Sequence, residues 1–121
     1  MTVSDIITHT QEMDFTLRYC AFLDDFKRAS NKAALVVQEP PESSLYEPHE
    51  YALLAAAVHL LCNRDGVSVP TWVMKDKYKL TQPSFAFGTQ NKKYQEFLKE
   101  TTMPEFSMRN LYYGDNAVNR I

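Results

Sequence analysis

The sequence predicts a single all-α domain spanning residues 1–121, and three observations support this prediction. Apolar side chains recur at helical spacing in several segments, whereas two-residue alternation is confined to one short stretch. Glycine occurs only three times, and folds rich in tight turns need more of it because glycine supplies positive φ. A chain of 121 residues buries enough surface to need no metal or disulfide staple. We therefore expect a compact bundle of four to five helices with a long irregular connection around residues 66–89.

The first helix is predicted to begin at Ser4 or Thr10 and to end near Ala29. Four aromatic side chains recur within it at spacings of four, three and four residues, which places them on one stripe of a helix. A stripe of this length is typical of a core face, so we expect these rings to pack inward. They are Phe15, Tyr19, Phe22 and Phe26.

Residues 33–46 are predicted to form a linker over the surface rather than a domain boundary. Val36 and Val37 suit a short extended piece. Pro40 and Pro41 exclude a helix at that point and stiffen the chain, because proline lacks a donor N–H and fixes φ.

The segment at about 48–63 is predicted to be the central helix. Pro48 suits a first helical turn, and Gly66 can adopt the left-handed conformation that ends a helix. Apolar residues cover two adjacent stripes of this helix, so its neighbours should surround it on most sides. The stripes consist of Tyr51, Leu54, Val58 and Leu61, and of Leu53, Ala57 and Leu60.

The second half of the chain shows weaker patterns. Lys75, Lys77 and Lys79 alternate with other residues as in an extended stretch, and a small strand pair can be accommodated within residues 67–88. A third helix is predicted from about 89 to 101, and Lys92 can pair with Glu96 on its outer side. Its inward face consists of Tyr94, Phe97 and Leu98.

Three short elements complete the predicted chain. Pro104 opens a fourth helix in which Phe106 packs inward. An extended piece follows at Leu111–Tyr113, and residues 117–121 form a final helical turn.

The formal net charge is −2, and it is uneven along the chain. Residues 1–65 contain ten acidic and five basic side chains, giving −5, whereas residues 66–121 contain five acidic and eight basic ones, giving +3. The two halves can attract each other, or the second half can bind an acidic partner. Lysines together with Trp72 and Tyr78 could bind nucleic acid, although the chain lacks the basic excess typical of such proteins. The lysines of this candidate interface are Lys75, Lys77, Lys79, Lys92 and Lys93.

Metal binding and catalysis have no recognisable motif in this sequence. His59 and Cys62 share a helix face, but the other potential ligands, His9, His49 and Cys20, lack the spacing of a known metal site. Neither cysteine follows a glycine turn or begins a helix, where its thiol pKa would fall, so we expect two separate buried thiols. We predict no metal and no cofactor.

The ends and the apolar segments of the chain predict a cytoplasmic protein without a membrane partner. The first residues, MTVSDIITHTQEMD, lack the basic start and the apolar run of a secretory leader. The longest apolar segment, YALLAAAVHLLC, is too short to cross a bilayer and suits a buried helix.

Several phrases of the sequence carry a resemblance to other proteins. They are CAFLDDFKRA, LLAAAVHLLCNRDGVSVPTW, PSFAF and MPEFSMRNLYYGDNAVNRI, and in the last of them Pro104, Phe106, Arg109 and Asn110 are the most distinctive. In this order the chain resembles an uncharacterised family of small bacterial helical domains. Such domains stand alone or follow a helix-turn-helix domain of a regulator, and some resemble partners in toxin–antitoxin loci. The resemblance implies a bacterial protein with a regulatory or partner-binding role, and it implies no catalytic residues.

Two side chains, Arg109 and Trp72, are predicted to contact a protein partner. Arg109 lies in a weakly charged segment, and a guanidinium there needs a carboxylate. That carboxylate is either Asp24 or Asp25 within the fold, which we favour, or an acid of the partner.

Three functional hypotheses remain at this point. The leading one is a non-enzymatic protein-interaction or regulatory module, antitoxin-like in character, with a protein partner and no turnover. The second is a nucleic-acid-binding protein that uses the lysines of residues 75–93 and binds less tightly as salt rises. The third is a small enzyme with an unrecognised site, which requires a pocket lined by His59 or by another titratable group.

Overall fold

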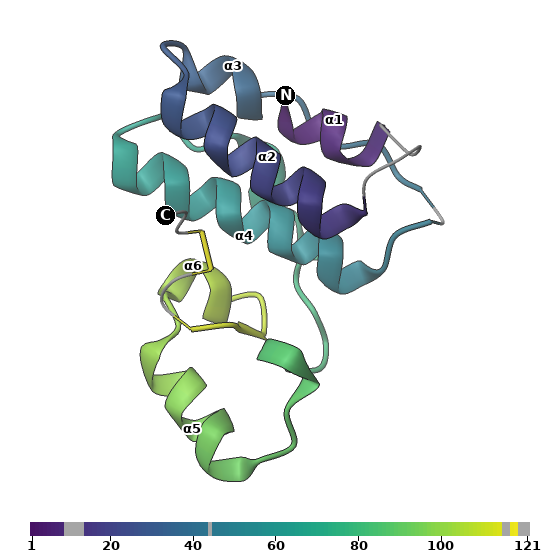
Figure 1. Cartoon of the computed structure of the whole chain (residues 1–121), viewed down its shortest axis with the longest axis vertical. Helices are drawn as coiled ribbons and strands as arrows, with labels where there is room; N and C mark the ends of the chain where they lie inside the picture. Colours follow the sequence, from purple (N-terminus) through teal and green to yellow (C-terminus); the bar gives the residue numbers. More distant parts are fainter. Residues whose placement is uncertain (9–13, 44, 115–116, 119–121) are drawn as a thin grey trace.

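The computed structural model describes residues 1–8, 14–43, 45–114 and 117–118, and this part of the chain is mostly α-helical (Figure 1). Four helices form the upper part of the molecule in Figure 1, with α1, α2 and α3 grouped above α4. The lower part contains α5, α6 and a two-stranded sheet. The upper helices are α1 (Val3–Thr8), α2 (Phe15–Arg28), α3 (Lys32–Val36) and α4 (Pro48–Asp65). The later elements are the 3-10 turns η1 (Thr71–Met74), η2 (Asp76–Tyr78) and η3 (Ala86–Gly88), strands β1 (Ser84–Phe85) and β2 (Leu111–Tyr112), and helices α5 (Lys92–Thr101) and α6 (Pro104–Ser107).

The amino-terminal segment forms two helices, α1 and α2, where one was predicted. Residues 9–13 between them lie outside the described part of the chain. Asp14 caps α2, because its carboxylate accepts a hydrogen bond from the backbone N–H of Leu17 at 2.9 Å. The predicted aromatic stripe is confirmed: its buried members are Tyr19, Phe22 and Phe26, and Phe15 packs against the edge of the core.

Helix α3 was not predicted, and the extended piece expected at Val36 and Val37 is wrong. Asn31 caps this helix by accepting a hydrogen bond from the backbone N–H of Ala34 at 3.4 Å. The helix forms because Val36 can reach the core from it, while Val37 stays exposed. As predicted, the described residues that follow, which include two prolines, form no helix.

Helix α4 is the central helix, as predicted, and it extends to Asp65. At its start the backbone N–H of Glu47 donates to the side chain of Glu50 at 2.8 Å. At its end Gly66 adopts the predicted left-handed conformation, with φ of 68°. These two ends fix the length of the helix around which the rest of the molecule packs.

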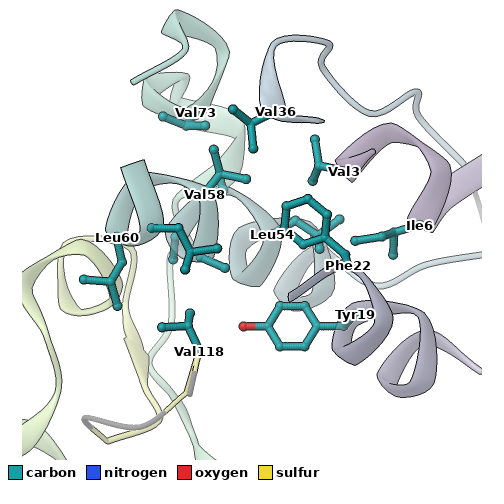
Figure 2. Close-up of a cluster of buried hydrophobic side chains, with 14 of the residues drawn as sticks. Val3, Ile6, Tyr19, Phe22, Val36, Leu54, Val58, Leu60, Val73 and Val118 are labelled. Atoms are coloured by element: carbon teal, nitrogen blue, oxygen red, sulfur yellow. The ribbon is translucent and has the colours of Figure 1, made fainter. Parts of the chain in front are cut away.

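The core lies where α1, α2 and α3 face α4. Figure 2 shows side chains from these four helices and from η1 converging on one volume. Three consecutive alanines of α4, residues 55–57, are fully buried and leave room for the large neighbours. Each fully buried valine, leucine or phenylalanine contributes about 2 kcal/mol to folding. The converging side chains include Val3, Ile6, Tyr19, Phe22, Val36, Leu54, Val58 and Val73.

The connection over residues 66–89 is irregular, as predicted, but its details differ. The lysines expected in an extended stretch lie in and beside the 3-10 turn η2, so that expectation is wrong. The strand pair does not form within residues 67–88: β1 pairs with β2 instead, in parallel, with Ser84 opposite Leu111. The predicted extended piece at 111–113 is therefore confirmed where β2 forms. Of the predicted final turn, residues 119–121 lie outside the described part of the chain.

The lower part packs on α4 through α6, and Phe106 of α6 is fully buried, as predicted. Helix α5 lies at the far end of the molecule in Figure 1 and contacts mainly β2. Only Leu98 of α5 is buried, so the inward placement predicted for Tyr94 and Phe97 is wrong. The fold is thus mostly α-helical, but a regular bundle of four to five helices is not confirmed.

Candidate binding surfaces

A hollow of about 550 Å³ opens between α2 and the lower part of the molecule. Five aromatic side chains from distant parts of the chain line it, and we call it the aromatic groove. Leu53 of α4 also lines the groove, beside the half-buried Cys20. The aromatic members are Phe15, Tyr19, Phe87, Tyr94 and Tyr113.

The lower rim of the aromatic groove exposes large apolar side chains to solvent. Of the lining residues, Phe87 is 97% exposed and Tyr94 is 37% exposed; Phe97, which does not line the groove but lies beside Tyr94, is 55% exposed. The rings of Tyr94 and Phe97 stack, with centroids 6.2 Å apart and planes at 14°. Exposed aromatic side chains gathered at a concave surface are characteristic of protein-interaction sites.

The backbone at Phe87 adds a second unusual feature. Phe87 has φ of 59° and ψ of 16°, which is the left-handed region. For a residue with a Cβ, this conformation is about 1 kcal/mol less stable than the right-handed one. Because the Phe87 ring is exposed to water, burial of the ring does not offset this cost. Strain of this kind at an exposed residue makes Phe87 a candidate functional residue.

Tyr19 anchors the floor of the groove. Its hydroxyl donates to the backbone carbonyl of Ala117 at 3.0 Å, which ties α2 to the carboxy-terminal segment. Burial raises the pKa of Tyr19 well above its usual range, so the hydroxyl stays protonated as a donor. The groove therefore has a fixed floor and an exposed rim.

Arg109, predicted to bind a partner or an aspartate of α2, is completely buried. One guanidinium nitrogen, Nη2, donates to the carbonyl of Val73 at 2.7 Å, and the other, Nη1, donates to the carbonyl of Glu105 at 2.6 Å. Nη1 also lies 3.2 Å from Nδ1 of His59. The favoured pairing with Asp24 or Asp25 is wrong, because Arg109 lies in the turn after α6 and its guanidinium contacts α4 and η1 rather than α2. Asp25 instead accepts hydrogen bonds from the chain amino group and from Arg28.

The contacts of the Arg109 guanidinium connect α6 with α4 and η1, so this side chain links the two parts of the molecule. Since a guanidinium only donates, Nδ1 of His59 must be the unprotonated acceptor in this contact. Burial and the neighbouring Arg109 charge lower the pKa of His59, which favours this neutral form. Burial lowers the pKa of Arg109 to about 10, and Glu105 opposes the shift. Glu105 also accepts a hydrogen bond from Asn63 of α4 at 2.9 Å.

Trp72, the other predicted partner contact, is only 5% exposed. Its indole Nε1 donates to the carbonyl of Val36 at 2.9 Å, and its ring meets that of Tyr78 edge-on at 5.5 Å. Both side chains predicted to contact a partner are therefore used inside the domain in this structure.

Three of the five lysines predicted to bind nucleic acid are paired within the chain. The carboxylate oxygens of Glu39 lie 2.6 Å from Nζ of Lys75 and 3.1 Å from Nζ of Lys77. Nζ of Lys79 lies 3.5 Å from a carboxylate oxygen of Asp76. The two pairs of Glu39 join an acid of the first half to bases of the second half, whereas Lys79 and Asp76 both belong to the second half. Lys92 and Lys93 are exposed, and in the described part of the chain neither forms an ion pair. The predicted pair between Lys92 and Glu96 is absent there.

The cysteines and histidines gather into no metal centre within the residues that the structure describes: no three His, Cys, Asp or Glu side chains lie close enough to hold an ion. Both thiols are free. Burial raises the pKa of Cys62 to about 11, which keeps that thiol protonated and unreactive. Among the described helices, none combines the length and the hydrophobicity needed to cross a bilayer.

No family model matches the chain, and the searches of curated proteins and of solved structures give no significant match. The resemblance to small bacterial helical domains thus stays a prediction. Any functional conclusion has to rest on the chemistry of the surfaces described above.

Sequence reasoning missed the aromatic groove because its members are far apart along the chain. One local signal was present: Phe87 stands in a loop framed by Pro83 and Gly88, where a large aromatic has no helix or strand to turn it inward. A second signal was the narrow apolar stripe of α5, which is polar on most of its surface. Neither the position of Phe87 in its loop nor the stripe of α5 shows from the sequence alone that the two lie at the same hollow.

Proposed function

We propose that this chain is a non-enzymatic protein-interaction module of the cytoplasm that binds a partner protein through the aromatic groove. The observation that carries the proposal is Phe87, whose ring is 97% exposed and stands at the rim of an aromatic hollow. Interfaces derive much of their binding energy from a few aromatic anchors at the centre of the contact. Covering this ring would recover burial energy that the isolated chain does not gain.

The two parts of the molecule suit this role. The upper part is a well-filled core, so the walls of the groove contributed by α2 and α4 are held firmly. The lower rim stands on α5, which shares little of its surface with the core. A groove with one fixed wall and one lightly packed wall can adjust to a partner without disturbing the core.

More specifically, we propose that the chain regulates the partner that it binds. In the most specific form of this proposal, the chain is an antitoxin-like component of a bacterium. The support for it is the sequence resemblance together with a binding surface on a small domain. Neighbouring genes provide an inexpensive check: a toxin-like gene beside this one would favour the antitoxin version.

Binding of nucleic acid is the alternative function, and its remaining support is the exposed pair Lys92 and Lys93. Two unpaired lysines provide a weak electrostatic attraction compared with the six to ten phosphate contacts of a typical nucleic-acid-binding site, roughly one charge per contact. The aromatic groove is therefore the better-supported surface.

The test is an affinity capture from the native host at physiological and at raised salt, with wild-type chain, Phe87→Asp and Leu45→Asp as baits. Leu45 is an exposed apolar residue outside the groove, so it is the matched control. We expect a stoichiometric partner with wild type and Leu45→Asp that survives raised salt and is lost with Phe87→Asp. Purified partner should then bind the baits in the same order by calorimetry.

Two results would contradict the proposal. One is a partner that Phe87→Asp retains as well as wild type does, which would place the interface elsewhere. The other is recovery of nucleic acid alone, released by salt, which would favour the alternative function.

A further inference from the structure

The contact between His59 and Arg109 joins the two parts of the molecule through a group that titrates near neutral pH. His59 belongs to α4 and is half-buried, whereas Arg109, in the turn after α6, is completely buried. Nδ1 of the imidazole lies 3.2 Å from Nη1 of the guanidinium and acts as the acceptor. Histidine is the side chain whose ordinary pKa lies in the physiological range, so mild acid can protonate this nitrogen.

Protonation of Nδ1 would deprive Arg109 of an acceptor and place a like charge beside it. The guanidinium would keep the carbonyl of Glu105, 2.6 Å from Nη1, and the carbonyl of Val73, 2.7 Å from Nη2. Its Nε is already buried without an acceptor among the residues that the structure describes. A buried cation that loses an acceptor and gains a positive neighbour is strongly disfavoured in an environment of low dielectric constant. The closed contact therefore requires a neutral His59.

The elements packed against α4 bring few charged groups to the imidazole of His59. The turn η1 and the strand β2 contain no charged side chain, and the charged side chains of η2 form ion pairs elsewhere. Arg109 disfavours the protonated ring, and Glu105 of α6 favours it. Burial and the Arg109 charge outweigh Glu105, so the pKa of His59 lies below its ordinary value.

The turn that carries Arg109 also holds the chain segments that follow α4. The backbone carbonyl of Arg109 accepts a hydrogen bond from the N–H of Leu80 at 3.2 Å, and that of Asn110 accepts one from the N–H of Ser84 at 2.8 Å. The side-chain amide of Asn110 donates to the carbonyl of Leu80 at 2.7 Å. Displacement of this turn from α4 would therefore expose the N–H groups of Leu80 and Ser84 to solvent.

We propose that His59 and Arg109 form a pH-sensitive link between α4 and the turn after α6. Protonation of Nδ1 breaks the contact with the guanidinium and releases this turn from α4 and η1, while the core between α1, α2, α3 and α4 stays folded. The link is closed above pH 6.5 and weakens as the pH falls below that value, because the open form binds the proton more readily than the closed form. The inference rests on the contacts of Arg109 and does not depend on the function proposed for the aromatic groove.

The test measures amide hydrogen exchange of the full 15N-labelled chain at about pH 7.5 and about pH 5, the range in which histidine titrates. Protection factors are compared, since these are corrected for the intrinsic effect of pH on exchange. Those of the Leu80 and Ser84 amides should fall roughly ten-fold at the lower pH, whereas that of Phe22 in the core should change less than about two-fold. Glu39, with its pKa of about 2, stays ionised throughout this range.

Two variants isolate the imidazole. His59→Asn places an amide oxygen near the position of Nδ1 and does not titrate, so its Leu80 and Ser84 amides should keep the same protection at both pH values. His49→Asn is the matched control, because His49 is exposed at the start of the same helix, and it should respond as wild type does. The ring resonances of wild-type His59 provide a readout that needs no variant: their titration should follow the same pH curve as the loss of protection.

Four results would overturn the inference. The first is unchanged protection of the Leu80 and Ser84 amides while the His59 ring titrates. The second is an equal loss of protection in His59→Asn. The third is an equal loss at Phe22, which would show general unfolding rather than release of the turn. The fourth is a His59 pKa at or above its ordinary value of 6.5, which would show that the Arg109 contact does not oppose protonation.

Discussion

Helices α4 and α5 have the same local ingredients but different surroundings. Both begin with a cap and both carry apolar residues at helical spacing. Nine of the 18 residues of α4 are buried, whereas only one of the ten residues of α5 is buried. Elements pack around α4 on several sides, while α5 contacts mainly β2. An apolar stripe is thus a core face in one helix and a solvent-exposed face in the other. The stripe of α5 is narrower, but the elements that pack around each helix decide which face is covered.

The sharpest way to break this comparison is to truncate a phenylalanine in each region. Phe22 of α2 is fully buried against α4, so Phe22→Ala should lower the free energy of unfolding by about 4 kcal/mol. Phe97→Ala removes the same atoms from the exposed face of α5 and should change it by less than about 0.5 kcal/mol. Urea denaturation measures both. Equal losses would show that α5 is enclosed by a core.

Arg109 links the two regions, and its removal should have the next largest effect. Arg109→Met keeps much of the volume but leaves the carbonyls of Val73 and Glu105 buried without a donor, which should cost about 3 kcal/mol. Arg28→Met is the control, because Arg28 is largely exposed beside Asp25. Comparison of the urea denaturation midpoints of Arg109→Met and Arg28→Met tests whether Arg109 stabilises the contact between the two regions. Similar midpoints would contradict it.

Glu39 should make the connection before α4 sensitive to acid. Burial would raise the pKa of Glu39, but hydrogen bonds from Lys75, Tyr78 and Lys77 outweigh it and lower the pKa from 4.5 to about 2. A lowered folded-state pKa stabilises the fold above pH 4.5, and this contribution disappears as pH falls from 4.5 toward about 2.

Glu39→Gln should therefore lose about 2 kcal/mol at neutral pH and show a flatter loss of stability down to about pH 3 than wild type does. Urea midpoints measured across this pH range give the result. Glu96→Gln on α5 is the control, since Glu96 is exposed. A wild-type pH profile no steeper than that of Glu39→Gln would refute the assignment.

The smallest expected effect concerns the end of α4. Gly66 has φ of 68°, and a Cβ placed there would meet no atom within 4 Å, so any cost of substitution comes from the backbone alone. Gly66→Ala should lower stability by about 1 kcal/mol, whereas Gly66→Asn should lower it less because asparagine tolerates this conformation. Thermal melting of both variants measures the difference. Equal melting temperatures for Gly66→Ala and Gly66→Asn would show that the left-handed conformation of residue 66 does not limit stability.

The sequence by itself determined the elements whose causes are local. Helix α4 was predictable because Pro48, the apolar stripes and Gly66 act within a few residues of one another. The stripe of α2 and the inward placement of Phe106 were predictable for the same reason. The helical class of the fold follows from these patterns.

Only the tertiary structure decided which apolar faces are covered and which polar groups meet. Arg109 binds carbonyls and His59, 50 residues away, rather than an aspartate, and β1 pairs with β2 across 27 residues. Tyr94 and Phe97 are exposed because the described chain places no element over them. The aromatic groove is assembled from segments that are distant in sequence, so periodicity and spacing along one segment carry no information about it.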